Sequence, residues 1–131
     1  MPPPPKVLVV DDTPQNIKVL EAVLIPRGYT VVAARSGAEA LARIGRDQPD
    51  LVLLDVVMPR RNGREVFEEI HRRAPRPVLF TSGYSADALP AEFLAEHGLF
   101  VLPKPYSPDR LLEQVRMALD EALGLVTPPV D

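Results

Sequence analysis

The chain has 131 residues, no cysteine and a formal net charge of −3, from 15 basic and 18 acidic residues. This length suits one domain, the absence of cysteine excludes a disulfide scaffold, and the slight acidity argues against the broad basic surface that non-specific nucleic-acid binding requires. No apolar run approaches the roughly 18 residues of a membrane span, and the first residues lack the pattern of a signal peptide. We therefore expect a cytoplasmic protein with no membrane insertion and no direct nucleic-acid binding.

Five short apolar runs are predicted to form strands. The third run places four consecutive apolar residues directly before Asp55, and an uninterrupted apolar run indicates a strand that is buried on both faces. The predicted strands cover residues 6–10, 30–34, 50–55, 77–81 and 99–102.

Helices are predicted to follow each of these strands. Thr13 can cap the first helix, Pro14 suits its first position, and Pro26 with Gly28 ends it. Alternating strands and helices predict an α/β domain whose parallel sheet carries helices on both faces. We expect this domain at 6–123, between a Pro-rich tail at 1–5 and a tail or linker at 124–131. The later helices are predicted at 36–46, from 62 through at least Ile70, at 85–97 with regular geometry only from 90, and at 107–124.

Four of the five predicted strands have polar residues at or just beyond their carboxyl ends. They are Asp11 and Asp12 after the first strand, Asp55 at the end of the third, Thr81 at the end of the fourth and Lys104 after the fifth. Ligands of open parallel sheets bind at this edge. Three carboxylates gathered there repel one another unless a divalent cation lies among them, and an all-oxygen site suits Mg²⁺. A carboxylate nucleophile beside a metal, an ammonium and a hydroxyl suits phosphoryl transfer.

Four motifs in this order resemble the receiver domains of bacterial two-component response regulators. They are VLVVDD at 7–12, LLDVVMPRRNG at 53–63, LFTSG at 79–83 and PKPY at 103–106. The resemblance implies a single flavodoxin-like (βα)5 domain with strand order 2-1-3-4-5. It also implies a phosphoacceptor in a histidine-to-aspartate phosphorelay. Such a domain is not a conventional enzyme, because it catalyses only its own phosphorylation and dephosphorylation.

The resemblance also implies roles for individual acids. Asp55 would accept the phosphoryl group. Asp12 and Asp55 would bind Mg²⁺ directly, together with the backbone carbonyl of Val57, and Asp11 would act mostly through water.

Thr81 and Lys104 would bind phosphoryl oxygens, and the sequence departs from the family next to them. Receiver domains usually carry Tyr or Phe three residues before the lysine, and that ring turns inward when the threonine moves toward the phosphate. Val101 occupies this switch position, and alternation along the strand should point Phe100 to the opposite face. Two interpretations stay open: a switch that relies on Thr81 and the loop after it, or a domain that mainly relays phosphate.

The resemblance implies a sensor histidine kinase or a histidine phosphotransfer protein as the partner that donates phosphate. Family members often dimerise or bind an effector through the fourth helix, fifth strand and fifth helix. The chain would be either a single-domain regulator or the receiver piece of a hybrid kinase or larger regulator.

A Mg²⁺-dependent phosphatase with an aspartyl nucleophile is the alternative function. That class usually carries a second acid two residues after the nucleophile, where this chain has Val57, and no segment is long enough to form a cap domain. The two histidines offer no alternative chemistry. His71 is expected on the exposed side of its helix and His97 near a helix end, and neither has a second histidine at ligand spacing, which argues against a transition-metal site.

Overall fold

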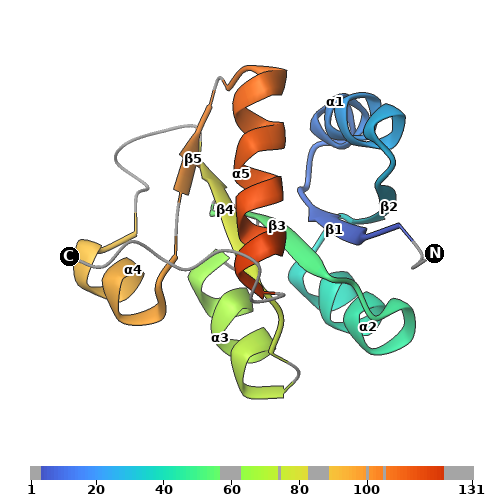
Figure 1. The fold of residues 1–131 in the computed structure, drawn as a ribbon. Helices are drawn as coiled ribbons and strands as arrows, with labels where there is room; N and C mark the ends of the chain where they lie inside the picture. The colour runs from blue at the N-terminus through green and yellow to red at the C-terminus, as the bar shows by residue number, and fades with distance from the viewer. Residues whose placement is uncertain are drawn as a thin grey trace.

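The computed structural model describes residues 4–56, 63–73, 75–82, 89–99, 101–104 and 106–122. Within these residues, five parallel strands form one sheet in the order β2-β1-β3-β4-β5 (Figure 1). This flavodoxin-like order confirms the predicted fold class. The strands are β1 Lys6–Val10, β2 Thr30–Ala34, β3 Leu51–Asp55, β4 Val78–Ser82 and β5 Val101–Pro103.

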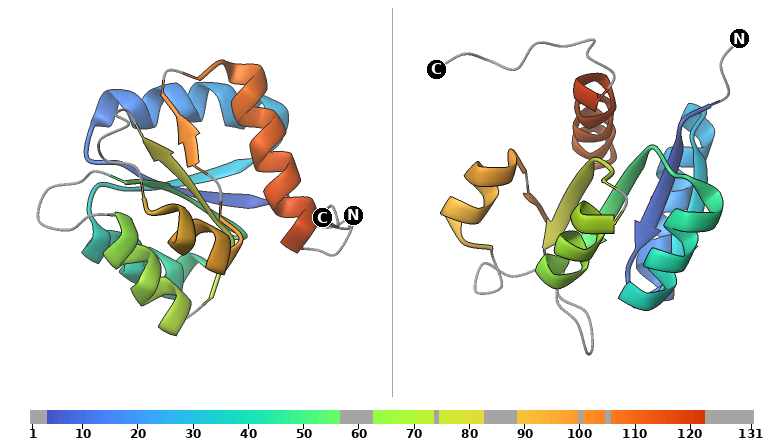
Figure 2. Two further views of the ribbon diagram at one scale, coloured as in Figure 1. Left: turned by 90° about the vertical axis from the view of Figure 1, so that its left-hand side faces the viewer. Right: turned by 90° about the horizontal axis from the view of Figure 1, so that it is seen from below.

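Helices cover both faces of the sheet, with α1 and α5 on one side and α2, α3 and α4 on the other (Figure 2, left). No helix of the described segments is long and apolar enough to cross a membrane. The helices are α1 Pro14–Leu24, α2 Gly37–Asp47, α3 Gly63–Arg73, α4 Ala91–His97 and α5 Pro108–Ala122, and the short 3-10 helix η1 Ile25–Arg27 follows α1.

The apolar core is divided by the sheet into two layers. Val7 and Val9 of β1 pack under α1 and α5, whereas Leu8 and Val10 pack under the opposite helices. This division follows from the alternation of side chains along a strand. All five residues of β3, the central strand, are buried, as its uninterrupted apolar run predicts. Asp55 is therefore a buried carboxylate at the end of the central strand.

The fifth strand begins two residues later than predicted. Gly98 ends α4 with φ 63°, and the Leu99 N–H donates to the Leu94 carbonyl at 2.8 Å. The N–H of Leu99 is thus used to cap the helix and is not available for the β4–β5 ladder, which starts with the pairing of Phe80 and Val101. The predicted start of the strand at 99 was therefore wrong.

Capping residues fix where the helices begin. The hydroxyls of Ser36 and Ser107 each accept a backbone N–H donor at 3.1 Å at the start of α2 and α5. Thr13 occupies the cap position of α1, but its side chain accepts no capping hydrogen bond. Its own N–H donates to Asp11 Oδ1 at 2.9 Å instead, so this turn is organised around a carboxylate.

Candidate functional site

Three carboxylates meet at the carboxyl edge of the sheet. Asp11 and Asp12 follow β1, Asp55 ends the neighbouring strand β3, and one carboxylate oxygen of each lies within 4.8 Å of the others. Asp11 is 2% exposed and Asp55 7% exposed, whereas Asp12 is partly buried. Because β1 and β3 are adjacent and parallel, their ends bring the acids together as the sequence predicted.

Lys104 reaches this cluster from the far side of β4. Its Nζ lies 3.4 Å from Asp11 Oδ2 and 3.6 Å from Asp55 Oδ2. Its backbone N–H donates to the Ser82 carbonyl at 2.7 Å, which continues the β4–β5 ladder by one residue. The backbone is therefore fixed, and the ammonium bridges two of the three carboxylates.

The described groups of the cluster carry excess negative charge. Three carboxylates and one ammonium sum to −3 + 1 = −2. Arg35 donates to the backbone carbonyl of Asp12 at 3.4 Å, but it is exposed and its charge is screened by solvent. A divalent cation would neutralise the remainder, and the carboxylate donors match the oxygen ligands that Mg²⁺ prefers. The residues therefore fit Mg²⁺.

Thr81 lies beside Asp55 in the sheet. The two residues are register partners in β3 and β4, so their side chains emerge on the same face about 5 Å apart at the backbone. Thr81 is 3% exposed, and its carbonyl accepts the N–H of Val56 at 2.9 Å. The hydroxyl of Thr81 is thus held at the same edge as the acids.

Gly63 places the start of α3 directly against the peptide of Asp55. Its N–H donates to the Val56 carbonyl at 2.7 Å, and a Cβ built on it would lie 2.7 Å from the Asp55 carbonyl oxygen and 2.8 Å from Val56 Cα. Both neighbours are backbone atoms, so no side chain fits here without moving the strand end. The sequence marked Gly63 as the end of the LLDVVMPRRNG motif and the start of a helix, and its packing role depends on this tertiary contact.

Asn16 is a site residue that the sequence analysis missed. Its Nδ2 lies 3.3 Å from Asp11 Oδ2 and 3.5 Å from Asp11 Oδ1. Together with the Thr13 N–H, it orients the Asp11 carboxylate. Its place in the first turn of α1, immediately after the acid pair, is the signal that could have identified it.

Tyr106 is a second residue that was not singled out. Burial, together with the charges of Asp11 and Asp55, raises the pKa of its phenol to about 12. The ring packs against the core layer under α1 and α5. Tyr106 therefore remains a neutral phenol close to the acids at physiological pH.

Of the two remaining predicted site positions, the structure describes Val101 but not Val57. Val57, whose carbonyl was expected to bind Mg²⁺, lies outside the described residues. Val101 is partly buried in β5 and packs on the core layer under α2, α3 and α4, opposite Phe80 in register. Phe100 lies outside the described residues, so the expectation for its ring stays a prediction.

Comparisons with known sequences point to one family. A family model described as the response regulator receiver domain matches residues 7–116. The transcriptional regulatory protein GlrR of Escherichia coli (strain K12) is 36% identical over 132 residues, which cover 98% of this chain and 28% of GlrR. The probable transcriptional regulator ycf27 of Guillardia theta is 37% identical over 116 residues, or 87% of this chain and 45% of that protein. The chain therefore spans less than half of either relative.

Solved structures show the same similarity. A CheY-like response regulator receiver domain protein from Methanospirillum hungatei JF-1 superposes with a TM-score of 0.82 at 28% identity, covering 92% of this chain and 98% of that one. The signal receiver domain of an HD domain-containing protein from Pseudomonas fluorescens Pf-5 gives a TM-score of 0.86 at 26% identity, covering 95% and 93%. The likeness thus extends over almost the whole chain.

Proposed function

The chain belongs to the response regulator receiver domain family, and on this premise we propose that it accepts a phosphoryl group on Asp55 with Mg²⁺ bound beside it. Membership in this family implies a cognate histidine kinase as partner. The proposed donor is a phosphohistidine on a sensor kinase or on a phosphotransfer protein. We further propose that the domain performs no catalysis beyond its own phosphorylation and dephosphorylation.

The observation that carries this proposal is the environment of the Asp55 carboxylate. Two other carboxylates have oxygens within 4.8 Å of it, and the Lys104 ammonium lies 3.6 Å from its Oδ2. In-line transfer needs a positioned nucleophile and positive charge around the phosphoryl oxygens. The acids that follow or end β1 and β3, together with Lys104 after β5, would supply both.

Each residue has a defined part in the proposed reaction. An Asp55 oxygen forms the new bond to phosphorus while the phosphorus–nitrogen bond of the phosphohistidine breaks, and the electron pair of that bond returns to the imidazole. Lys104 exchanges its contact with Asp55 for one with a phosphoryl oxygen, and the Thr81 hydroxyl donates to another. Asp11 and Asp12 would hold Mg²⁺ with Asp55, and the bound ion would offset the charge of the phosphoryl oxygens. Hydrolysis of the acyl phosphate then restores Asp55.

Mass measurement after incubation with acetyl phosphate tests the assignment. We expect one added phosphoryl group in Mg²⁺, and none after removal of Mg²⁺ with EDTA or in Asp55→Asn. Asp120→Asn is the matched control, because Asp120 lies in the last turns of α5 and pairs with Arg116 at 3.4 Å; it should be labelled like the unchanged chain. Labelling of Asp55→Asn would contradict the proposal, and rapid multiple turnover on small phosphate esters would instead support the aspartyl phosphatase.

We propose Thr81, rather than Val101, as the residue that carries the signal. Thr81 is the register partner of Asp55, whereas Val101 packs into the core and has no ring to turn. Structures solved with and without a phosphate analogue test this, and we expect Thr81 to move toward the analogue. An unmoved Thr81 would contradict a switch and favour simple phosphate relay. The expectation that α4, β5 and α5 bind an effector or a second copy stays a prediction.

A further inference from the structure

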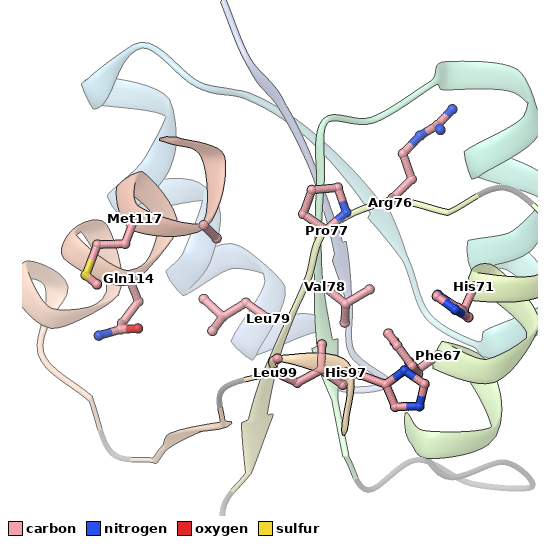
Figure 3. A pocket seen from close by; sticks show the side chains of 12 residues that line it. Phe67, His71, Arg76, Pro77, Val78, Leu79, His97, Leu99, Gln114 and Met117 are labelled. Atoms are coloured by element: carbon pink, nitrogen blue, oxygen red, sulfur yellow. The ribbon is translucent and has the colours of Figure 1, made fainter. Parts of the chain in front are cut away.

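A cavity of about 300 Å³ lies between α3, the end of α4 and α5, beside the first residues of β4 (Figure 3). Pro77 and Val78 line it at the amino end of β4, so it opens at the sheet edge opposite to the acids. His71 of α3 and His97 of α4 line its wall, and they are the only two histidines of the chain. The fold thus gathers every imidazole of this protein in one place.

The two imidazoles are close together and held by aromatic packing. Their ring centroids lie 5.3 Å apart, with an angle of 73° between the ring planes. Phe67 packs against both, with centroids 5.6 Å from His71 and 5.0 Å from His97, and Phe93 lies 4.9 Å from His97. Phe67 is 4% and Phe93 5% exposed. The imidazoles therefore rest on a buried aromatic base that limits their movement.

The ring nitrogens are available to a ligand. Among the segments that the structure describes, neither imidazole has a hydrogen-bond or ion-pair partner, and the ion pairs of α3 next to His71 join Arg72 and Arg73 to Glu69. Arg76 also lines the cavity, but its guanidinium donates to the Pro75 carbonyl and to Gln48 Oε1 and points away from the imidazoles (Figure 3). The Arg76 side chain is thus directed toward Gln48 at the end of α2 and away from the two imidazoles.

We propose that His71 and His97 form a binding site for a divalent transition metal ion, distinct from the carboxylate cluster. Imidazole nitrogen is a preferred ligand of Zn²⁺, Cu²⁺ and Ni²⁺. Zn²⁺ lies about 2.0–2.1 Å from such a nitrogen, so two imidazoles on one tetrahedral ion have centroids about 5 Å apart. The observed 5.3 Å is that of an edge-to-face ring pair and is close to this spacing, so α3 and α4 need not move apart for both imidazoles to bind one ion. The cavity has room for the waters that complete the coordination. A bound ion would join α3 to α4.

Calorimetric titration of the untagged chain with ZnCl₂ tests the site. Excess Mg²⁺ is present throughout, because it occupies the carboxylate cluster and has little affinity for imidazole. We expect one Zn²⁺ per chain, and a rise in melting temperature on addition of Zn²⁺. No cysteine is available to compete as a ligand.

His71→Phe and His97→Phe are the informative variants, since each keeps a ring against Phe67 and removes only the nitrogens. Each should weaken Zn²⁺ binding by roughly tenfold or more, because one imidazole cannot chelate the ion, and the double variant should bind at least as weakly as either single one. Asp55→Asn should bind Zn²⁺ like the unchanged chain. This result would separate the site from the phosphoacceptor, whose own test uses acetyl phosphate.

Two results would overturn the proposal: absence of Zn²⁺ binding by the folded chain in excess Mg²⁺, or equal binding by the chain and either Phe variant. Melting in EDTA shows whether each variant is folded. Nitrogen NMR of the unchanged chain gives a readout that needs no variant, because signals from both imidazoles should shift at the same Zn²⁺ concentration. A shift of only one imidazole, or of neither, would also contradict the site.

Discussion

The Nζ atom of Lys104 lies 3.6 Å from Oδ2 of Asp55, although β4 separates their two strands in the sheet. The side chain of Asp55 is 9% exposed and that of Lys104 is 24% exposed, so this ion pair is only partly screened by water. Before any phosphoryl group arrives, Lys104 is a positive charge that holds the acids together. From the same position, the Lys104 ammonium would contact an oxygen of a phosphoryl group on Asp55, as proposed above.

Replacing Lys104 should therefore reduce stability most strongly when no metal is present. Lys104→Met leaves three close carboxylates without their ammonium. We expect the free energy of unfolding in EDTA to fall by about 1–3 kcal/mol, because the removed partner was partly buried. Mg²⁺ should recover much of this loss. Urea unfolding with EDTA and with Mg²⁺ measures it, and Lys18→Met on the exposed side of α1 should change stability little in either condition. Equal losses with and without Mg²⁺ would count against the electrostatic cause.

Mg²⁺ should raise the stability of the folded chain. A ligand that binds only the folded state at a hundred times its Kd stabilises by about 2.7 kcal/mol, which corresponds to a shift of several degrees in Tm. Asp12→Asn should be more stable than the unchanged chain in EDTA, because it removes one repelling charge, and should lose most of the gain from Mg²⁺. Asp109→Asn, at an exposed acid in the first turn of α5, should keep that gain. An undiminished gain in Asp12→Asn would remove Asp12 from the proposed metal site.

A methyl group at Gly63 should disturb both the fold and the phosphoacceptor. A Cβ there would lie 2.7 Å from the Asp55 carbonyl oxygen, and relief of this contact requires the end of β3 or the start of α3 to move. We expect Gly63→Ala to lower the free energy of unfolding by about 1–3 kcal/mol, as overpacked sites do. We also expect acetyl phosphate to label this variant more slowly.

Gly45→Ala provides the matched comparison for this substitution. Gly45 is exposed within α2, and a Cβ there meets nothing within 4 Å. The free energy of unfolding of Gly45→Ala should rise by about 0.5–1 kcal/mol, because alanine loses less backbone entropy than glycine when it folds into a helix. Unfolding in urea measures both variants, and a Gly63→Ala chain as stable as Gly45→Ala would show that the contact is easily relieved.

The phenol of Tyr106 should make stability depend on alkaline pH. Its pKa is raised to about 12 by burial and by the charges of Asp11 and Asp55, against a usual value of about 10. The unfolded chain loses this proton near pH 10, while the folded chain keeps it until about pH 12. The contribution of the neutral Tyr106 phenol to the free energy of unfolding is therefore complete below pH 10, and it is lost as pH rises through 12.

Tyrosinate absorbance measures this titration, with Tyr106→Phe subtracted to remove the other two tyrosines of the chain. Asp55→Asn should lower the pKa of Tyr106 toward its usual value, because one of the two negative charges is removed. Tyr106→Phe should also show a shallower fall in stability between pH 10 and 12. An unchanged pKa in Asp55→Asn would mean that burial and the charge of Asp11 account for the shift without Asp55.

Local patterns determined much of this protein in advance. The apolar run before Asp55 indicated a fully buried strand, and the alternation of strands with helices indicated a parallel sheet whose carboxyl edge would gather the acids. Those signals are readable from sequence because each depends on neighbours in the chain, through side-chain alternation and helical spacing. Ser36 and Ser107 marked helix starts for the same reason.

Only the tertiary structure decided which distant groups share a contact. The glycine contact at Asp55 and the pairing of His71 with His97 both depend on how elements pack, and sequence spacing holds no information about packing distances. The two histidines show this most clearly. Their separation in the chain argued against a shared ligand, whereas the packing of α3 beside α4 brings their rings to 5.3 Å. Chain connectivity fixed which residues are neighbours along an element, and burial of the apolar faces fixed which elements became neighbours in space.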